Sequence, residues 1–109
     1  MPIREITVEA LRDALATGEK VALLDVRNEH EHVMAKLEPC RLVPLHELAD
    51  RLDEIDDWKD ARVVVYCHHG VRSRSGAAIL EAAGFRDVVS LRGGIDAWSM
   101  RVDPKIPRY

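Results

Sequence analysis

The stretch from residue 62 to residue 84 places the tightest constraint on how this chain can fold. It begins with an apolar run, Arg62–Tyr66, whose composition is typical of a strand buried on both faces. A short loop with a glycine follows at 67–72, and the small residues of 73–83 predict a helix that ends at Gly84. A strand, a tight loop and a helix in this order indicate one unit of a parallel α/β fold.

The same alternation continues along the rest of the chain. Apolar runs predict further strands at 3–6, 21–26, 41–43 and 87–91. Helices are predicted between and after them, from Thr7 to Gly18 and at 28–36, 45–55 and 95–100. This order favours an α/β fold with a mostly parallel sheet covered by helices on both faces.

The length of the chain limits its domain organisation. With 109 residues it can form one domain with its own core but not two, so we expect a single domain over residues 1–109. Residues 102–109 contain two prolines and little apolar surface, and we expect them to form a C-terminal surface arm.

Charge and cysteine content exclude several classes of function. The net charge is −3 and the arginines are scattered, which argues against nucleic-acid binding. The apolar runs are too short to span a membrane, and the first residues do not have the pattern of a signal peptide. Two cysteines form no disulfide framework, and a reactive free thiol suits a reducing compartment, so we expect a cytoplasmic protein.

Cys67 lies where the predicted strand meets the loop. The N-terminus of the next helix and successive loop N–H groups direct positive charge towards such a sulfur, and Arg72 adds a permanent cation. These surroundings favour the thiolate, which is the nucleophilic form of cysteine. A lone cysteine is more often a packing residue, but this setting favours a catalytic nucleophile.

This loop resembles the active-site loop of rhodanese-like sulfurtransferases, in which four residues including a glycine separate a cysteine from an arginine. The resemblance extends to Leu24–Arg27, Pro44–Leu45 and Gly93–Trp98. It implies the rhodanese-like three-layer fold with a central sheet of about five strands. It also implies that Cys67 is the catalytic residue and that the substrate-binding loop consists of His68, His69, Gly70, Val71, Arg72 and Ser73.

For the reaction, the resemblance implies that Cys67 accepts sulfane sulfur as a persulfide and passes it to a thiophilic acceptor or a sulfur-carrier protein. The donor would be thiosulfate or a protein persulfide, and no metal or organic cofactor is needed. The C-terminal segment resembles rhodanese domains fused to adenylylating enzymes of sulfur-carrier pathways. The partners implied are a cysteine desulfurase as donor and a sulfur carrier or its adenylylating enzyme as acceptor.

Two other functions remain open at this point. A rhodanese-like domain can serve as a protein-binding module without turnover, and a related fold is found in cysteine phosphatases and arsenate reductases. Phosphatases place five residues between the cysteine and the arginine, whereas four stand between Cys67 and Arg72. The smaller ring fits one sulfur atom better than a phosphate group, so we expect no useful phosphatase activity.

Asp25 and Arg27 are the supporting site residues. They stand at the carboxyl end of the strand 21–26, where α/β proteins place their sites. They either form an ion pair that braces the loops or act directly, and the resemblance implies bracing for Asp25. Cys40 lies in a segment that departs from the family pattern, and it is either a resolving thiol or, as we favour, a structural residue.

Zinc is the metal to consider, because His30 and His32 flank Glu31 and because His68 and His69 follow Cys67. His30 and His32 lie in a polar stretch and are expected to be solvated, and Cys67 has no second ligand pair, so we expect no metal site. His69 occupies the position where rhodaneses that prefer thiosulfate often have a lysine, and Glu31 brings negative charge towards the same edge. The resemblance therefore implies weak use of thiosulfate and better use of a protein persulfide.

Overall fold

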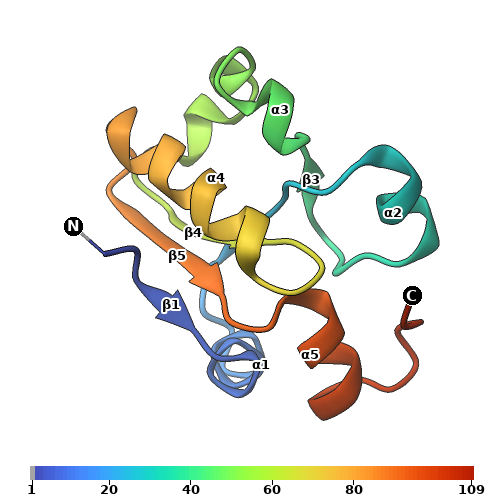
Figure 1. The fold of residues 1–109 in the computed structure, drawn as a ribbon. Coiled ribbons are helices and arrows are strands. Elements are labelled where there is room, and N and C mark those ends of the chain that lie inside the picture. Colours follow the sequence, from blue (N-terminus) through green and yellow to red (C-terminus); the bar gives the residue numbers. More distant parts are fainter. Residues whose placement is uncertain (1) are drawn as a thin grey trace.

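The computed structural model describes residues 2–109, and this part of the chain forms one five-stranded parallel sheet (Figure 1). The strand order is β1-β5-β4-β2-β3. The central strand β4 pairs with β2 on one side and with β5 on the other. The strands are β1 (Glu5–Ile6), β2 (Ala22–Asp25), β3 (Arg41–Leu42), β4 (Arg62–Tyr66) and β5 (Asp87–Leu91). The predicted α/β fold with a sheet of about five strands is confirmed.

Helices cover both faces of this sheet (Figure 1). They are α1 (Val8–Ala16), α2 (Glu29–Met34), α3 (Leu45–Leu48), the 3₁₀ helix η1 (Leu52–Trp58), α4 (Val71–Ala82) and α5 (Gly94–Arg101). One core contains buried residues of α3, η1 and α4, and the other contains buried residues of α1 and α5. Alternate residues of β4 point to opposite faces, so Val65 packs in the first core and Tyr66 in the second.

The segment 45–55, predicted as one helix, is instead two short pieces, α3 and η1. The backbone leaves helical geometry at Arg51 (φ −122°) and again at Ile55 (φ −124°). Residues 50–57 contain four aspartates, whose side chains compete for backbone hydrogen bonds and disfavour a helix interior. The predicted apolar stripe is nevertheless correct, because Leu48 and Ile55 are fully buried.

Helix α4 begins at Val71, two residues earlier than the sequence predicts, because Gly70 adopts a left-handed conformation (φ +99°) that turns the chain directly into the helix. The helix then lies close to the sheet. A Cβ atom on Gly76 would lie 3.2 Å from the side chains of Val26 and Val65. The small residues of this helix therefore serve close packing, and they bring its N-terminus to the end of β4.

Residues 102–109 follow α5 along the surface. Val102 and Ile106 pack against the core on the α1–α5 side, and the chain then turns back so that Tyr109 reaches the carboxyl edge of the sheet. Just before β3, the crossing from α2 contains a cis peptide bond between Glu38 and Pro39. Between residues 2 and 109, no helix combines the length and the apolarity that are needed to cross a membrane.

Candidate active site

Cys67 stands at the end of β4 with only 1% of its surface exposed, and backbone donors surround its sulfur. The N–H groups of Gly70 and Ser73 donate to Sγ over 3.1 and 3.2 Å. The hydroxyl of Ser73 lies 3.4 Å from the same sulfur. Two N–H groups on one sulfur stabilise an anion, so the loop holds Cys67 in surroundings suited to a thiolate or to a charged sulfur bonded to it.

Helix α5 holds the loop from behind. The N–H groups of Ile95 and Asp96 donate to the carbonyl oxygens of Cys67 and His68 over 2.9 and 3.1 Å. Across these trans peptides, the N–H groups of His68 and His69 point away from α5, and neither has an acceptor within residues 2–109. The loop therefore offers more N–H donors than the sulfur of Cys67 uses.

Gly94 allows this close approach of α5 to the loop. Its φ is +62°, and a Cβ atom there would lie 2.4 Å from the carbonyl oxygens of both Cys67 and His68. No side chain fits at that distance, so the glycine fixes how near the helix comes.

Ser90 is a site residue that the sequence argument missed. It is fully buried on β5, and its hydroxyl lies 2.7 Å from the hydroxyl of Ser73, which is also fully buried. This bond fixes the Ser73 hydroxyl beside the sulfur of Cys67. The signal was a polar residue within the otherwise apolar stretch Val88–Leu91.

The positive charge of Arg72 does not act on the sulfur of Cys67 alone. Its guanidinium forms two hydrogen bonds with the carboxylate of Glu31 on α2, of 2.7 and 2.9 Å. Glu31 is 6% exposed, and its hydrogen bonds from Arg72 hold its pKa at about 2 despite burial. The cation predicted beside Cys67 is therefore paired with an anion at the same edge of the sheet.

Tyr109 joins this group from the far end of the chain. Its hydroxyl donates to Glu31 over 2.8 Å and accepts from the guanidinium of Arg27 over 2.8 Å. Its ring stacks on His68, with the ring centroids 3.9 Å apart. Burial, together with the neighbouring carboxylate of Glu31, raises the pKa of Tyr109 to about 12, so the hydroxyl stays protonated and remains a donor.

Asp25 and Arg27 form a fully buried ion pair. Two nitrogens of the guanidinium bind the two carboxylate oxygens over 2.9 and 2.8 Å, and the backbone N–H of Arg27 adds a third bond. Burial disfavours the charge of Arg27, but its bonds to Asp25 and Tyr109 outweigh burial and raise its pKa. Within residues 2–109 the pair makes no hydrogen bond to Cys67, so this geometry favours bracing over a direct role.

His32 belongs to this buried network. Its Nδ1 lies 2.9 Å from a carboxylate oxygen of Asp25, and 19% of its side chain is exposed. The prediction that His32 is solvated is therefore wrong, because α2 turns it inwards towards the end of β2. His30 on the same helix is exposed, as predicted.

His68, His69 and Asp96 come close enough to suggest a metal site, with ligand atoms within 4.8 Å of one another. The two imidazole rings, however, are stacked with centroids 3.8 Å apart and planes only 28° apart. Lone pairs of nearly parallel rings do not converge on one ion. Asp96 is also bound by Arg108 over 2.9 Å, which lowers its pKa. The stacked rings and the pairing of Asp96 with Arg108 therefore favour a cluster held by its own contacts over a metal centre.

Cys40 lies on the other face of the sheet from Cys67. It packs against the α1–α5 core, whereas Cys67 belongs to the core under α4. The hydroxyl of Tyr66 donates to its sulfur over 3.5 Å, and burial raises the pKa of the Cys40 thiol. The sheet itself separates the two thiols, so the structural interpretation of Cys40 is favoured over that of a resolving thiol.

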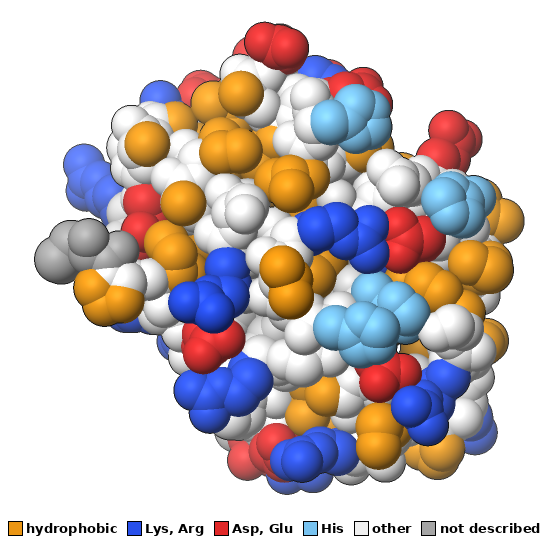
Figure 2. Space-filling model, viewed as in Figure 1, with side chains coloured by type: hydrophobic (Ala, Val, Ile, Leu, Met, Phe, Trp, Pro, Cys, Tyr) orange, Lys and Arg blue, Asp and Glu red, His pale blue; other side chains and the backbone are white. Residues whose placement is uncertain are grey.

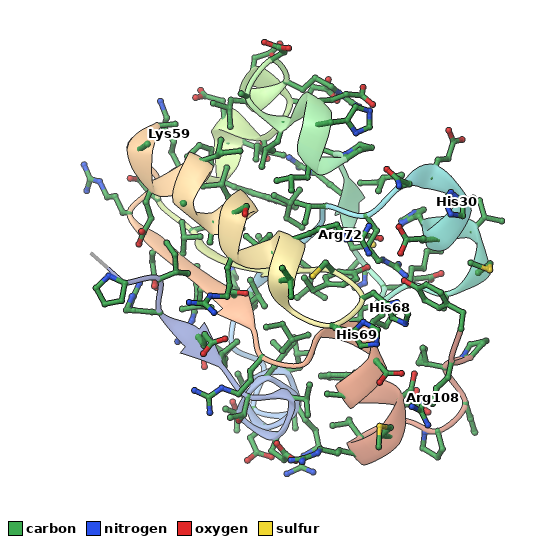
Figure 3. All side chains as sticks on the ribbon, in the orientation of Figure 1. His30, Lys59, His68, His69, Arg72 and Arg108 are labelled. Carbon is green, nitrogen blue, oxygen red and sulfur yellow. The ribbon has the colours of Figure 1, made fainter. Side chains whose placement is uncertain are left out.

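The surface beside the loop is hollowed and carries charges of both signs. A hollow of about 430 Å³ adjoins Gly70 and Val71 and is also lined by His69, Arg74 and Arg92. Figure 2 shows the histidines of this face with basic and acidic side chains directly beside them. In Figure 3, Arg72 extends from the start of α4 towards α2, next to His68 and His69.

Comparisons with known proteins agree with this geometry. A family model described as "Rhodanese-like domain" matches residues 7–101. A protein named "Sulfurtransferase" from Allochromatium vinosum is 38% identical over 97 residues, which cover 89% of either chain. The Mycobacterium tuberculosis protein named "Probable adenylyltransferase/sulfurtransferase MoeZ" is 38% identical over 95% of this chain. The chain spans 26% of the length of that relative.

Solved structures give the same answer for the fold. A rhodanese-like domain protein from Staphylococcus aureus is 28% identical and superposes with a TM-score of 0.80. The match covers 98% of this chain and 99% of that one. A rhodanese-related protein from Thermoplasma volcanium reaches a TM-score of 0.82 at 24% identity.

Proposed function

Because the chain belongs to the rhodanese-like domain family, we propose that it is a sulfurtransferase in which Cys67 carries the transferred sulfur as a persulfide. The observation that carries this proposal is the pair of backbone N–H groups, from Gly70 and Ser73, that donate to the sulfur of Cys67. Relatives named sulfurtransferases, at 29–38% identity, support the class of reaction.

In the first half-reaction, the thiolate of Cys67 attacks the outer sulfur of the donor. A new S–S bond forms as the S–S bond of the donor breaks, and the electron pair of that bond leaves with the remainder of the donor. A protein persulfide leaves as a thiolate, and thiosulfate leaves as sulfite. Cys67 then carries one additional sulfur with a negative charge.

The loop stabilises that terminal sulfur through its N–H groups. Those of His68 and His69 have no acceptor within the described chain, and those of Gly70 and Ser73 already face the thiol sulfur. Such preorganised donors lower the energy of an anion without reorganisation during the reaction. No metal or organic cofactor takes part in these steps.

In the second half-reaction, a thiophilic acceptor attacks the terminal sulfur. The bond between the two sulfurs breaks, and its electron pair returns to Cys67 as a thiolate, which is ready for the next cycle. Asp25 and Arg27 brace the edge on which the loop rests, and they do not touch the reacting sulfur.

The names of the relatives support a proposal for the partners. Several are adenylyltransferase/sulfurtransferase proteins, and one is named a putative sulfur carrier protein. We therefore infer that a sulfur carrier, or the enzyme that adenylylates it, accepts the sulfur from Cys67. A thiol of that enzyme would attack the terminal sulfur as above; with the carrier itself, the terminal sulfur attacks the adenylylated carboxyl group, AMP leaves, and a thiol reductant then cleaves the S–S bond to Cys67. A cysteine desulfurase that holds a persulfide is the matching donor.

Mass spectrometry tests the proposal directly. The purified protein is incubated with thiosulfate or with a loaded cysteine desulfurase, and peptide mapping locates any added sulfur. We expect the mass of one sulfur atom on the peptide with Cys67, in wild type and in Cys40→Ser, and none in Cys67→Ser. Absence of added sulfur from every donor would instead support a protein-binding module.

A further inference from the structure

The arginines on one side of the loop are each paired with a carboxylate. Arg72 binds Glu31, and Arg108 binds Asp96 over 2.9 Å. Below them, Arg27 binds Asp25. Figure 3 shows Arg72 and Arg108 on either side of His68 and His69. This side of the mouth of the loop is therefore close to electrically neutral.

Glu31 is fixed in place by every polar group that touches it. Its carboxylate accepts two hydrogen bonds from Arg72, one from the hydroxyl of Tyr109 and one from the backbone N–H of Asn28. With only 6% of its surface exposed, it cannot turn into solvent without losing these bonds. The neutralisation of Arg72 is thus built into the fold and does not arise from a chance surface contact.

We propose that Glu31 is a specificity-determining residue that disfavours small dianionic sulfur donors by neutralising Arg72, and so favours a persulfide delivered by a protein. This inference rests on the proposed sulfurtransferase function. A small dianion such as thiosulfate has little besides charge with which to bind, so it depends on an uncompensated cation at the mouth of the loop. A protein persulfide carries a single charge and adds the contacts of a protein surface.

The other cations near the mouth do not replace Arg72. Arg74 is exposed in the hollow on the far side of Val71, where solvent and salt screen its charge. Burial and the neighbouring His69 lower the pKa of His68, so its ring is neutral near pH 7. Arg72 is therefore the cation whose pairing matters, and Glu31 is the group that controls it.

The variant Glu31→Gln removes one negative charge and keeps the size of the side chain. We expect kcat/KM for thiosulfate to rise about tenfold, mainly through KM, while kcat changes less than twofold. Transfer from a loaded cysteine desulfurase should change less than twofold. The matched control is Glu29→Gln, an exposed carboxylate on the same helix, which changes the net charge equally and should leave both donors unaffected.

A second measurement does not depend on sulfur transfer. Iodoacetamide and iodoacetate alkylate the same thiol, but only iodoacetate is charged. The rate with iodoacetate divided by the rate with iodoacetamide, both measured at Cys67, therefore reports the electrostatic potential at the mouth. This ratio should rise about threefold in Glu31→Gln. Iodoacetate carries one negative charge and thiosulfate two, so the same change in potential has half the effect on the energy of iodoacetate, and a tenfold change becomes about threefold. It should fall about threefold in Arg72→Gln, which leaves Glu31 uncompensated.

In the double variant Glu31→Gln with Arg72→Gln, the ratio should return to within twofold of wild type, because a pair with no net charge has been removed. Equal ratios in wild type, Glu31→Gln and Arg72→Gln would overturn the inference, as would an equal gain in Glu29→Gln. An increased ratio without any gain in thiosulfate use would overturn the assignment of specificity. If the ratio responds as expected but no donor loads Cys67 in any variant, the sulfurtransferase proposal fails while the charge effect of Glu31 stands.

Discussion

Cys67 and Cys40, the two thiols of this chain, show what the fold adds to the same side chain. Cys40 is half-buried and lines a hollow of about 550 Å³, whereas Cys67 is almost completely buried. Judged by exposure alone, Cys40 would be the reactive residue. The sulfur of Cys67, however, receives two backbone N–H groups, and the sulfur of Cys40 receives one phenol hydroxyl at 3.5 Å.

The difference comes from the connections that follow the two residues. After Cys67, a left-handed glycine and the first turn of α4 bring the N–H groups of the loop around the sulfur, and α5 holds the loop from behind. After Cys40 comes the short edge strand β3, which keeps the backbone extended. Oriented donors, and not access to solvent, therefore distinguish the candidate nucleophile from the structural thiol.

The comparison is tested most severely by exchanging each sulfur for oxygen. In a thiosulfate-to-cyanide assay, Cys67→Ser should lower activity about 10³-fold or more, because the serine hydroxyl does not form a persulfide. Cys40→Ser should keep activity within about twofold of wild type. An active Cys67→Ser protein together with an inactive Cys40→Ser protein would reverse the assignment of the two thiols.

A second prediction separates the support of the loop from the thiol itself. Gly94→Ala places a Cβ atom 2.4 Å from two carbonyl oxygens of the loop, so α5 or the loop must shift. We expect a loss of about 3 kcal/mol in the free energy of unfolding, with sulfur transfer lowered by at least about 10²-fold. Urea unfolding and the same assay measure both effects.

Gly84→Ala is the matched control for that substitution. Gly84 also has a positive φ, of +92°, but nothing lies within 4 Å of a Cβ atom there. It should therefore cost only about 1 kcal/mol of backbone strain and leave activity unchanged. If both alanine variants lose the same stability and activity, close packing of α5 against the loop does not explain the site.

Acid should affect the surroundings of the two thiols differently. The ion pair between Glu31 and Arg72 lies beside the loop of Cys67, whereas Cys40 is held by a phenol and apolar packing. The pKa of Glu31 is about 2 in the fold and about 4.5 in an unfolded chain. The stability from this pair is therefore complete above about pH 5 and is lost as the pH falls towards 2.

Urea unfolding at several pH values measures that contribution. Wild type should be more stable than Glu31→Gln by about 2 kcal/mol at pH 7, and the difference should shrink towards zero near pH 2, where Glu31 becomes protonated. The stability of Glu29→Gln should follow the wild-type curve to within about 0.5 kcal/mol, because Glu29 is exposed. A gap between wild type and Glu31→Gln that does not change with pH would contradict the role of the ion pair.

The features of the site that sequence predicts are those set by neighbours along the chain. The strand, the loop and the helix around Cys67 are continuous in sequence, so periodicity and the position of Gly70 were sufficient. The same local reasoning was wrong for residues 45–55, where apolar spacing indicated one helix and aspartates broke it. Apolar spacing shows which residues are buried, but it does not determine which type of helix buries them.

The missing site residues come from distant parts of the chain. Glu31 binds a residue 41 positions away, and Tyr109 binds one 78 positions away. Glu31 was expected to bring negative charge to this edge, but its pairing with Arg72 depends on how α2 packs beside α4. Tyr109 had no local signal, because its contacts exist only once the segment after α5 has turned back to the sheet edge.

The smallest expected effect concerns the thiol that we regard as structural. In Cys67→Ser, the remaining thiol is Cys40, whose pKa is raised by burial, although the hydroxyl of Tyr66 partly offsets this. Alkylation of Cys40 by iodoacetamide should therefore be slow at pH 7, and its rate should still be rising at pH values where an ordinary thiol has reached its plateau, since the thiolate is the reacting form. Cys40→Ala should change the free energy of unfolding by less than about 1 kcal/mol, because the thiol is only half-buried and adds one weak hydrogen bond.

The decisive comparison is the alkylation rate of Cys40 in Cys67→Ser against that of Cys67 in Cys40→Ser, both at pH 7. If the more exposed Cys40 reacts faster there, exposure outweighs the backbone donors, and the distinction drawn between the two thiols is lost.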